Sequence, residues 1–197
     1  MHSKFLEARK HIDCNRLEEA RQVLEEYSKT DVLCIYGLYV LVDTGYITDE
    51  EDKRKIINQF SSVFSELEAL SQKNDLETIY TLGVCYERGY IVNRNLSNAM
   101  RLYQKAYKKG HIRAGFNLAY CHQSKNELSE MKKAIEIYKY LAEQDMVEAM
   151  TNLGIIYLYY RPCIDIKSAR HYLKCAIDKG DALAARHLQE LERIHSI

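Results

Sequence analysis

The sequence contains no tryptophan, a single proline (Pro162) and only eight glycines among its 197 residues. Proline and glycine interrupt helix interiors, so their scarcity favours a chain that is helical almost throughout. The chain also lacks an excess of charge of either sign, with 28 basic and 28 acidic residues. Because proteins that bind nucleic acid usually have a basic excess, we expect no nucleic-acid partner.

A long hydrophobic segment is missing as well. The longest apolar run covers residues 32–42 and lies between Asp31 and Asp43, which is too short for a helix that spans a bilayer. Residues 1–5 lead directly into Glu7 and Arg9 without an apolar signal segment. We therefore expect no membrane insertion and a cytoplasmic location, or export by a route that needs no signal.

The cysteines form no recognisable site. None of the six belongs to a Cys-x-x-Cys pair, and none stands at a zinc-ligand spacing from a histidine. They are therefore interpreted as free thiols that pack as small apolar groups, with no metal and no cofactor implied. The six are Cys14, Cys34, Cys85, Cys121, Cys163 and Cys175.

The sequence does contain a repeat with a period of 35 residues. Small and apolar residues recur in step over the last 120 residues or so, which indicates one helical unit copied and stacked so that each copy buries its apolar face against the next. A second register advances by 36, 35 and 35 residues. The columns are Ala99, Ala134 and Ala169; Ala106, Leu141 and Ala176; Gly110, Asp145 and Gly180; Ala114, Ala149 and Ala184; and, in the second register, Leu82, Leu118, Leu153 and Leu188.

The apolar periodicity predicts an all-α chain of antiparallel helical hairpins. We expect a single domain over 1–197, with divergent hairpins in 1–75, three repeats in 76–183 and a capping helix in 184–197. Whether the first hairpins are extended repeats or a cap is left open. The predicted helices are 5–12, 17–27, 31–43, 49–73, 76–88, a helix from Asn95 or Ser97 to Gly110, 112–124, 129–144, 147–160, 165–179 and 182–194.

Small residues mark the places where paired helices approach closely. Gly83, Ala119 and Gly154 share one column of the first helix in each repeat. A bulky side chain there would overpack the crossing with the second helix. We expect a leucine in place of Gly154 to unfold or splay the third repeat.

One stretch of the sequence resembles a known repeat family. Residues 82–110 read Leu-Gly-x-x-Tyr-x-x-Gly-x-x-Val-x-x-Asn and then Ala-x-x-Leu-Tyr-x-x-Ala-x-x-x-Gly. This pattern resembles the Sel1-like repeat, a relative of the tetratricopeptide repeat. Residues 114–148 and 149–183 are weaker copies, in which Ala119, His122 and Asp145 replace family residues.

The resemblance implies a right-handed α-solenoid that binds proteins or peptides. In such arrays the first helix of each hairpin lines the concave side. The stripe rotated by one residue from its buried face is then the expected partner-binding groove, which an amphipathic helix or an extended segment would fill. The alternative is that curvature or the N-terminal hairpins bury part of this stripe. Its members are Tyr80, Val84, Glu87, Phe116, Tyr120, Gln123, Thr151, Ile155, Leu158, Tyr159, Arg186 and Glu190.

Catalytic chemistry has little support in the sequence. No nucleophile elbow, phosphate-binding loop or His-Glu-x-x-His string is present. His171 and Cys175 lie four residues apart, but two ligands do not make a metal site. We therefore predict a non-enzymatic scaffold or adaptor for a protein or peptide partner. The alternatives are an inhibitor, immunity-type protein or secreted effector with one protein target, and an enzyme that uses Cys or His chemistry.

Overall fold

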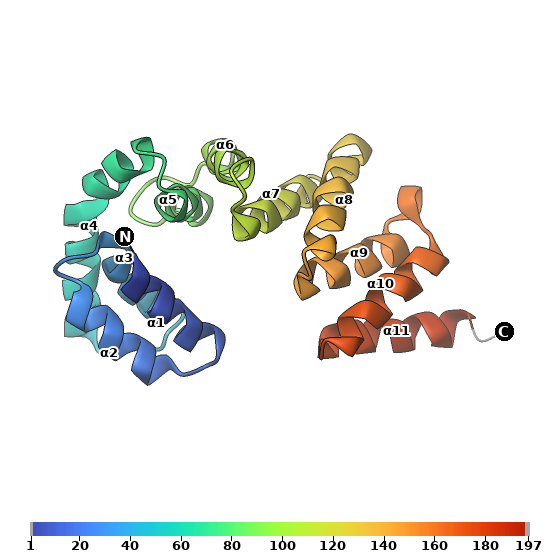
Figure 1. Ribbon diagram of the computed structural model, residues 1–197, viewed down its shortest axis with the longest axis horizontal. Helices are drawn as coiled ribbons and strands as arrows, with labels where there is room; N and C mark the ends of the chain where they lie inside the picture. Colours follow the sequence, from blue (N-terminus) through green and yellow to red (C-terminus); the bar gives the residue numbers. More distant parts are fainter. Residues whose placement is uncertain (1, 196–197) are drawn as a thin grey trace. The chain divides into compact units, whose positions relative to one another are not determined.

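The computed structural model describes residues 2–195, and side chains up to residue 193. Within these residues every regular element is helical, as predicted (Figure 1). The helices are α1 (Ser3–Asp13), α2 (Leu17–Tyr27), α3 (Val32–Asp43), α4 (Glu50–Gln72), α5 (Leu76–Arg88), α6 (Leu96–Tyr107), α7 (Ile112–Ser124), α8 (Leu128–Glu143), α9 (Val147–Tyr159), a 3₁₀ turn η1 (Arg161–Cys163), α10 (Ile166–Asp178) and α11 (Ala182–His195).

The chain divides into two compact units. Unit 1 comprises Met1–Leu102 and unit 2 comprises Tyr103–Ile197, so the boundary lies within α6. The expected single domain over 1–197 stays a prediction.

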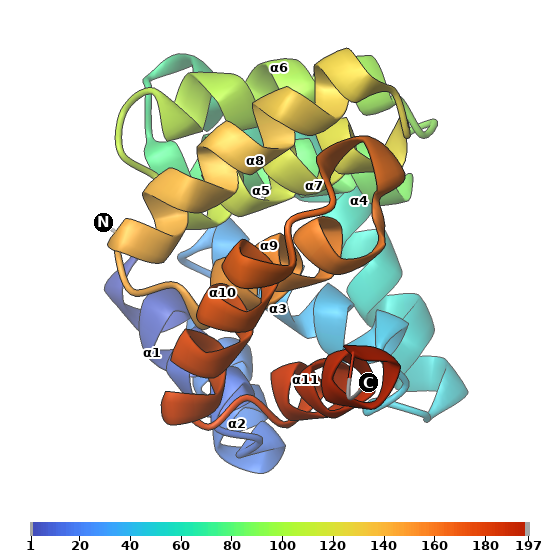
Figure 2. The ribbon, with the colours of Figure 1, turned by 90° about the vertical axis from the view of Figure 1, so that its right-hand side faces the viewer.

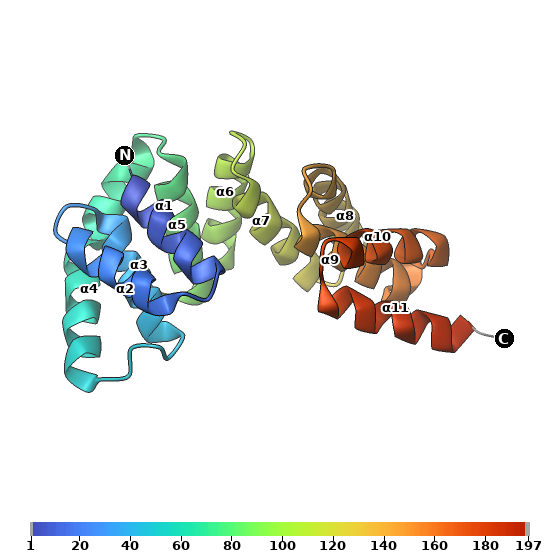
Figure 3. The same ribbon diagram turned by 60° about the horizontal axis from the view of Figure 1, so that its bottom comes forward.

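Unit 1 is built around α3. In the hairpins α1–α2 and α3–α4 the paired helices pack on each other, and α5 packs on α4 (Figure 3). Most of α3 is buried, as its continuous apolar sequence predicts. The ring of Tyr36 lies 6.2 Å from that of Phe5 and 5.9 Å from that of Phe60. These aromatic contacts join α1 and α4 to the central helix.

Aspartates begin three of the unit 1 helices. Asp31, Asp49 and Asp75 each precede a helix and accept hydrogen bonds from backbone N–H groups of its first turn. These groups have no partner within the helix, so a capping carboxylate stabilises the helix start. Asp49 accepts from the backbone N–H groups of both Glu51 and Asp52 at the start of α4.

In no helix within residues 2–195 is the apolar stretch long enough to cross a bilayer.

Unit 2 is a stack of hairpins in which α7 pairs with α8, α9 pairs with α10, and α11 packs on both α9 and α10 (Figure 2). The alanine columns of the repeat lie inside this stack. Ala134, Ala169 and Ala176 are fully buried, and so are Ala149 and Ala184. The 35-residue period therefore marks the packing surfaces, as the sequence predicts.

One column of the repeat has an unusual backbone conformation. Gly110, Asp145 and Gly180 follow successive second helices and have φ values of 92°, 64° and 91°. Residues with a Cβ rarely adopt this left-handed conformation, whereas glycine adopts it freely. The second repeat therefore holds an aspartate in a conformation that suits glycine.

Gly154 marks a close crossing between α9 and α10. A Cβ atom placed on Gly154 would lie 2.5 Å from Cγ of Leu173, whose side chain is fully buried. Real Cβ atoms do not approach that closely, and the surrounding core leaves Leu173 little room to move. The small residue at this position is required by packing.

We predict that Gly154→Ala destabilises the chain by about 1–3 kcal/mol, because the added methyl overpacks the crossing. In an open helix the same change would stabilise by about 0.5–1 kcal/mol, so the sign of the effect is informative. Urea denaturation followed by circular dichroism measures it. Combining the change with Leu173→Ala should cost less than the sum of the two single variants; strict additivity would contradict the contact.

The left-handed column gives a second prediction. Asp145→Gly should raise the free energy of unfolding by about 0.5–1 kcal/mol, because glycine relieves the strain at positive φ. The contact of Asp145 with Lys179, 3.0 Å, is exposed and contributes little. The matched control is Gly110→Asp, which introduces the same residue one repeat earlier and should destabilise. Equal signs for the two changes in thermal and urea unfolding would refute the assignment.

Candidate functional site

Unit 2 has a cleft of about 370 Å³ between the C-terminal parts of α7 and α9 and the turn that leads into α8. Tyr120 and Tyr159 are among its most exposed side chains, at 54% and 42%. Exposed aromatic side chains beside a cleft are typical of interaction surfaces. The cleft is lined by Tyr120, Gln123, Ser124, Asn126, Met131, Ile155, Ile156, Tyr159 and Tyr160.

Four residues of the predicted stripe meet in this cleft. They are Tyr120 and Gln123 of α7 and Ile155 and Tyr159 of α9. Phe116 of the same stripe is partly buried, and its ring packs 5.7 Å from that of Tyr138. Phe116 therefore supports the core under the surface.

Two other members of the stripe lie inside the protein. Thr151 is 3% exposed, and its hydroxyl donates to Asp181, which caps α11. Leu158 is 6% exposed and packs with Ala169 and Leu191. Both residues are covered because α9 is contacted by α10 and α11. The prediction that Thr151 and Leu158 line an exposed groove is therefore wrong, because both side chains are buried.

A neighbouring helix holds Tyr159 in place. Its hydroxyl donates to Glu190 of α11 at 2.6 Å and lies 3.1 Å from Nδ1 of His187. Burial, together with the bond to Glu190, raises the pKa of Tyr159 to about 12. The phenol therefore remains a neutral hydrogen-bond donor at physiological pH. Arg186 is exposed on the same helix.

The unit 1 members of the stripe are less accessible. Tyr80, Val84 and Glu87 of α5 are all half-buried. The guanidinium of Arg9 in α1 lies 5.6 Å from the centre of the Tyr80 ring and also pairs with Glu77. Helix α1 thus covers part of α5, as the alternative interpretation of the stripe allows.

The cleft also contains residues that the repeat pattern did not predict. Ser124 and Asn126 belong to the end of α7 and the following turn, and Tyr160 follows α9. The hydroxyl of Tyr160 donates to the backbone oxygen of Asn126 at 3.4 Å. Turn residues do not follow the helical period, so a stripe drawn along one helix misses them.

A buried carboxylate closes the α7–α8 turn next to the cleft. Glu130 in the first turn of α8 accepts hydrogen bonds from Lys125 at 2.7 Å, from Lys133 at 2.5 Å and from Nδ1 of His122 at 2.9 Å. These bonds hold the pKa of Glu130 well below its ordinary value, and the bond from Lys125 has the largest effect. His122 is thus a largely buried, hydrogen-bonded side chain.

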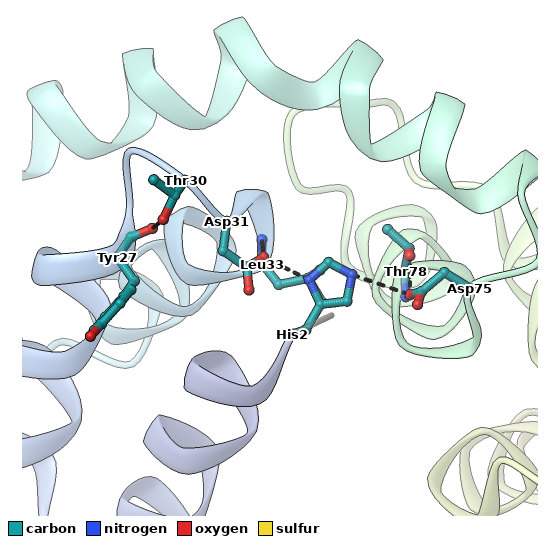
Figure 4. Close-up of polar contacts among 7 residues, drawn as sticks. All are labelled: His2, Tyr27, Thr30, Asp31, Leu33, Asp75 and Thr78. Atoms are coloured by element: carbon teal, nitrogen blue, oxygen red, sulfur yellow. Dashed lines mark hydrogen bonds and ion pairs between the residues drawn. The ribbon is translucent and has the colours of Figure 1, made fainter.

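A second cavity, of about 340 Å³, lies beside the start of α1 in unit 1. Figure 4 shows the ring of His2 between Asp31 and Asp75, the N-caps of α3 and α5. Its Nδ1 lies 2.8 Å from Asp31 Oδ1, and its Nε2 lies 3.5 Å from Asp75 Oδ1. This junction ties the start of one helix to the starts of two others.

Three of the cysteines, Cys34, Cys85 and Cys121, are buried, whereas Cys14 is exposed. Burial raises the pKa of the Cys34 and Cys85 thiols to about 12, so neither is a thiolate at neutral pH. Cys175 Sγ lies 3.9 Å from His171 Nε2 on the surface of α10. Among the described residues, no group of three or more His, Cys, Asp or Glu side chains is arranged to hold a metal ion.

The fold and its packing columns define a helical-repeat protein. The sequence model of the Sel1 repeat matches residues 77–111 and 147–181, the first and third of the three copies. A solved Sel1 repeat protein from Oxalobacter formigenes has the same fold, with a TM-score of 0.57 and 19% sequence identity over 84% of this chain and 66% of that one. Two segments of the chain are therefore similar to the Sel1 repeat in sequence, and the chain shares the fold of a Sel1 repeat protein.

Two fungal proteins are similar in sequence. Chitin synthase regulatory factor 3 of Schizosaccharomyces pombe is 36% identical over 84 residues, which cover 42% of this chain and 9% of that protein. Chitin synthase regulator SKT5 of Saccharomyces cerevisiae is 23% identical over 91% of this chain and 28% of its own length. The chain thus spans less than a third of these two curated relatives.

The Glu130 cluster generates a prediction on pH. Because the pKa of Glu130 in the folded chain lies below its ordinary value of 4.5, its carboxylate stabilises the fold above about pH 4.5, and this contribution is lost as the pH falls further. Glu130→Gln should therefore lower the free energy of unfolding at pH 7. At pH 3 the free energies of unfolding of the variant and the wild type should differ by less than they do at pH 7. Urea denaturation at several pH values measures both effects. The control is Glu136→Gln, an exposed change on the same helix, which should leave the free energy of unfolding unchanged at both pH values. If Glu130→Gln lowered the free energy of unfolding by the same amount at every pH, the carboxylate of Glu130 would not be the stabilising group.

Proposed function

We propose that this chain is a non-enzymatic interaction module, a scaffold or adaptor that holds a peptide or protein segment in the unit 2 cleft. The observation that carries the proposal is the pair of exposed tyrosines, Tyr120 and Tyr159, on either side of a cleft of about 370 Å³. Large aromatic side chains supply much of the binding energy at protein interfaces.

The comparisons support this choice in a general way. The two fungal relatives are named as regulators of chitin synthase, a description that belongs to those proteins. A regulator acts by contacting another protein, and stacked helical repeats provide an extended surface for such contacts. An inhibitor or effector with a single target would use the same cleft, and identification of the bound protein separates these roles.

We predict that Tyr120→Glu abolishes partner binding and leaves stability within about 0.5 kcal/mol, because the side chain is exposed. The matched control is Tyr140→Glu, an equally drastic change at a tyrosine of α8 that is 43% exposed and lies outside the cleft. Affinity capture with the wild type and both variants, followed by titration of each purified candidate, measures the effect.

Binding that survives Tyr120→Glu, or that is lost equally in both variants, would count against the cleft. Phe116 is unsuitable for this test because its ring packs against Tyr138 in the core. Tyr80 is unsuitable because α1 covers part of it.

A further inference from the structure

The ring of His2 is enclosed by acidic groups at the start of α1 (Figure 4). The side chain is 7% exposed, and its two nitrogens face two different carboxylates. Nδ1 lies 2.8 Å from Asp31 Oδ1, and the buried Nε2 lies 3.5 Å from Asp75 Oδ1. Both aspartates also accept a backbone N–H at the start of a helix, α3 or α5. The histidine therefore joins α1 to the N-caps of two other helices.

The protonation of the ring decides how well this arrangement is satisfied. A neutral imidazole has one N–H and one nitrogen with a lone pair. Either neutral tautomer would direct that lone pair at a carboxylate oxygen in a buried site, where an unsatisfied polar atom is costly. The imidazolium ion has an N–H on each nitrogen and places a positive charge between two negative ones. The geometry thus fits the doubly protonated ring.

The surroundings of the ring are acidic apart from one lysine. Lys4 of α1 lines the same cavity as His2, but it pairs with Glu7 at 2.9 Å, so these two charges compensate each other. Tyr27, at the end of α2, also lines the cavity and is uncharged at neutral pH. The other charged groups that contact the ring or line the cavity are carboxylates, which favour a positive ring although its burial opposes a charge. They are Asp31, Asp75 and Glu66 of α4.

We propose that His2 is a pH-sensitive latch, which holds the start of α1 on the starts of α3 and α5 while its ring is doubly protonated and loosens when the ring becomes neutral. Arg9 of α1 also pairs with Glu77 of α5, but arginine and glutamate both stay charged between about pH 5 and pH 8. His2 is the contact that changes its charge in this range. Because α1 covers part of Tyr80 on α5, the latch sets how firmly that surface is covered.

The direction of the pH effect follows from the proton count. The folded chain holds a proton on His2 that the unfolded chain has released at neutral pH, so stability falls as the pH rises through the range in which histidine titrates. The contribution of the latch is fully present on the acidic side of that range. The exposed residues Ser3 and Glu66 also line the cavity of about 340 Å³ beside the ring, so protons can reach it from solvent.

The test is a double-mutant cycle in the full chain with His2→Asn and Asp75→Asn, singly and together, by urea denaturation at about pH 5.5 and about pH 8.5. Asparagine caps helices as well as aspartate does, so Asp75→Asn removes the charge and keeps the cap of α5. The coupling between the two residues should change the equilibrium constant of unfolding about five- to thirtyfold at the acidic pH. At the alkaline pH the coupling should be less than about twofold, because a neutral ring no longer attracts the carboxylate.

The matched control is Asp49→Asn, which removes the same charge from the N-cap of α4. Asp49 caps this helix through the backbone N–H groups of Glu51 and Asp52. Its effect on stability should therefore be the same at both pH values, and it should add to that of His2→Asn.

A direct measurement keeps the proposal testable if a variant fails to fold. Nitrogen NMR of the wild-type chain at about pH 7 should show both nitrogens of the His2 ring protonated, although a free histidine side chain is mostly neutral at this pH. A ring with a single N–H at that pH would overturn the proposal. So would a coupling between His2 and Asp75 that is equal at the two pH values. Either result would leave the function proposed for the unit 2 cleft unaffected.

Discussion

The close approach of paired helices through columns of small residues is the constraint on which the structure of unit 2 depends. Ala134 and Ala169 are fully buried, and Gly154 leaves no space for even a methyl group beside Leu173. Because each hairpin covers the apolar face of the next, stability in such arrays is a sum of local interfaces. A larger side chain in one column therefore destabilises first the helix–helix interface that contains it.

Repetition made the fold predictable from the sequence. The period of 35 residues located the buried columns, and the apolar stripes located the helices to within one or two residues at most ends. Aspartate caps fixed several helix starts, such as Asp75 before α5 and Asp165 before α10. These features are local, because each depends only on the sequence of the helix and of the residues next to it.

The site was less predictable, because it depends on contacts between elements. A stripe drawn on one helix treats all first helices alike, but α9 is contacted by α8, α10 and α11. That extra contact buries Thr151 and Leu158. Asn126 and Tyr160 line the cleft from positions outside the helices, where no periodic signal exists. The sequence therefore indicated Tyr120 and Tyr159 but not the cleft that they border.

The fixed turn beside the cleft has a consequence for the entropy of association. Glu130 ties together side chains from α7, the turn and α8, so this wall is already ordered before any ligand arrives. A preorganised wall loses little conformational freedom when it is occupied. Adjustment then falls to the exposed ring of Tyr120, and rotamer changes of exposed side chains take picoseconds to nanoseconds. Entry of a guest residue would therefore be governed by diffusion and by the ordering of the guest itself.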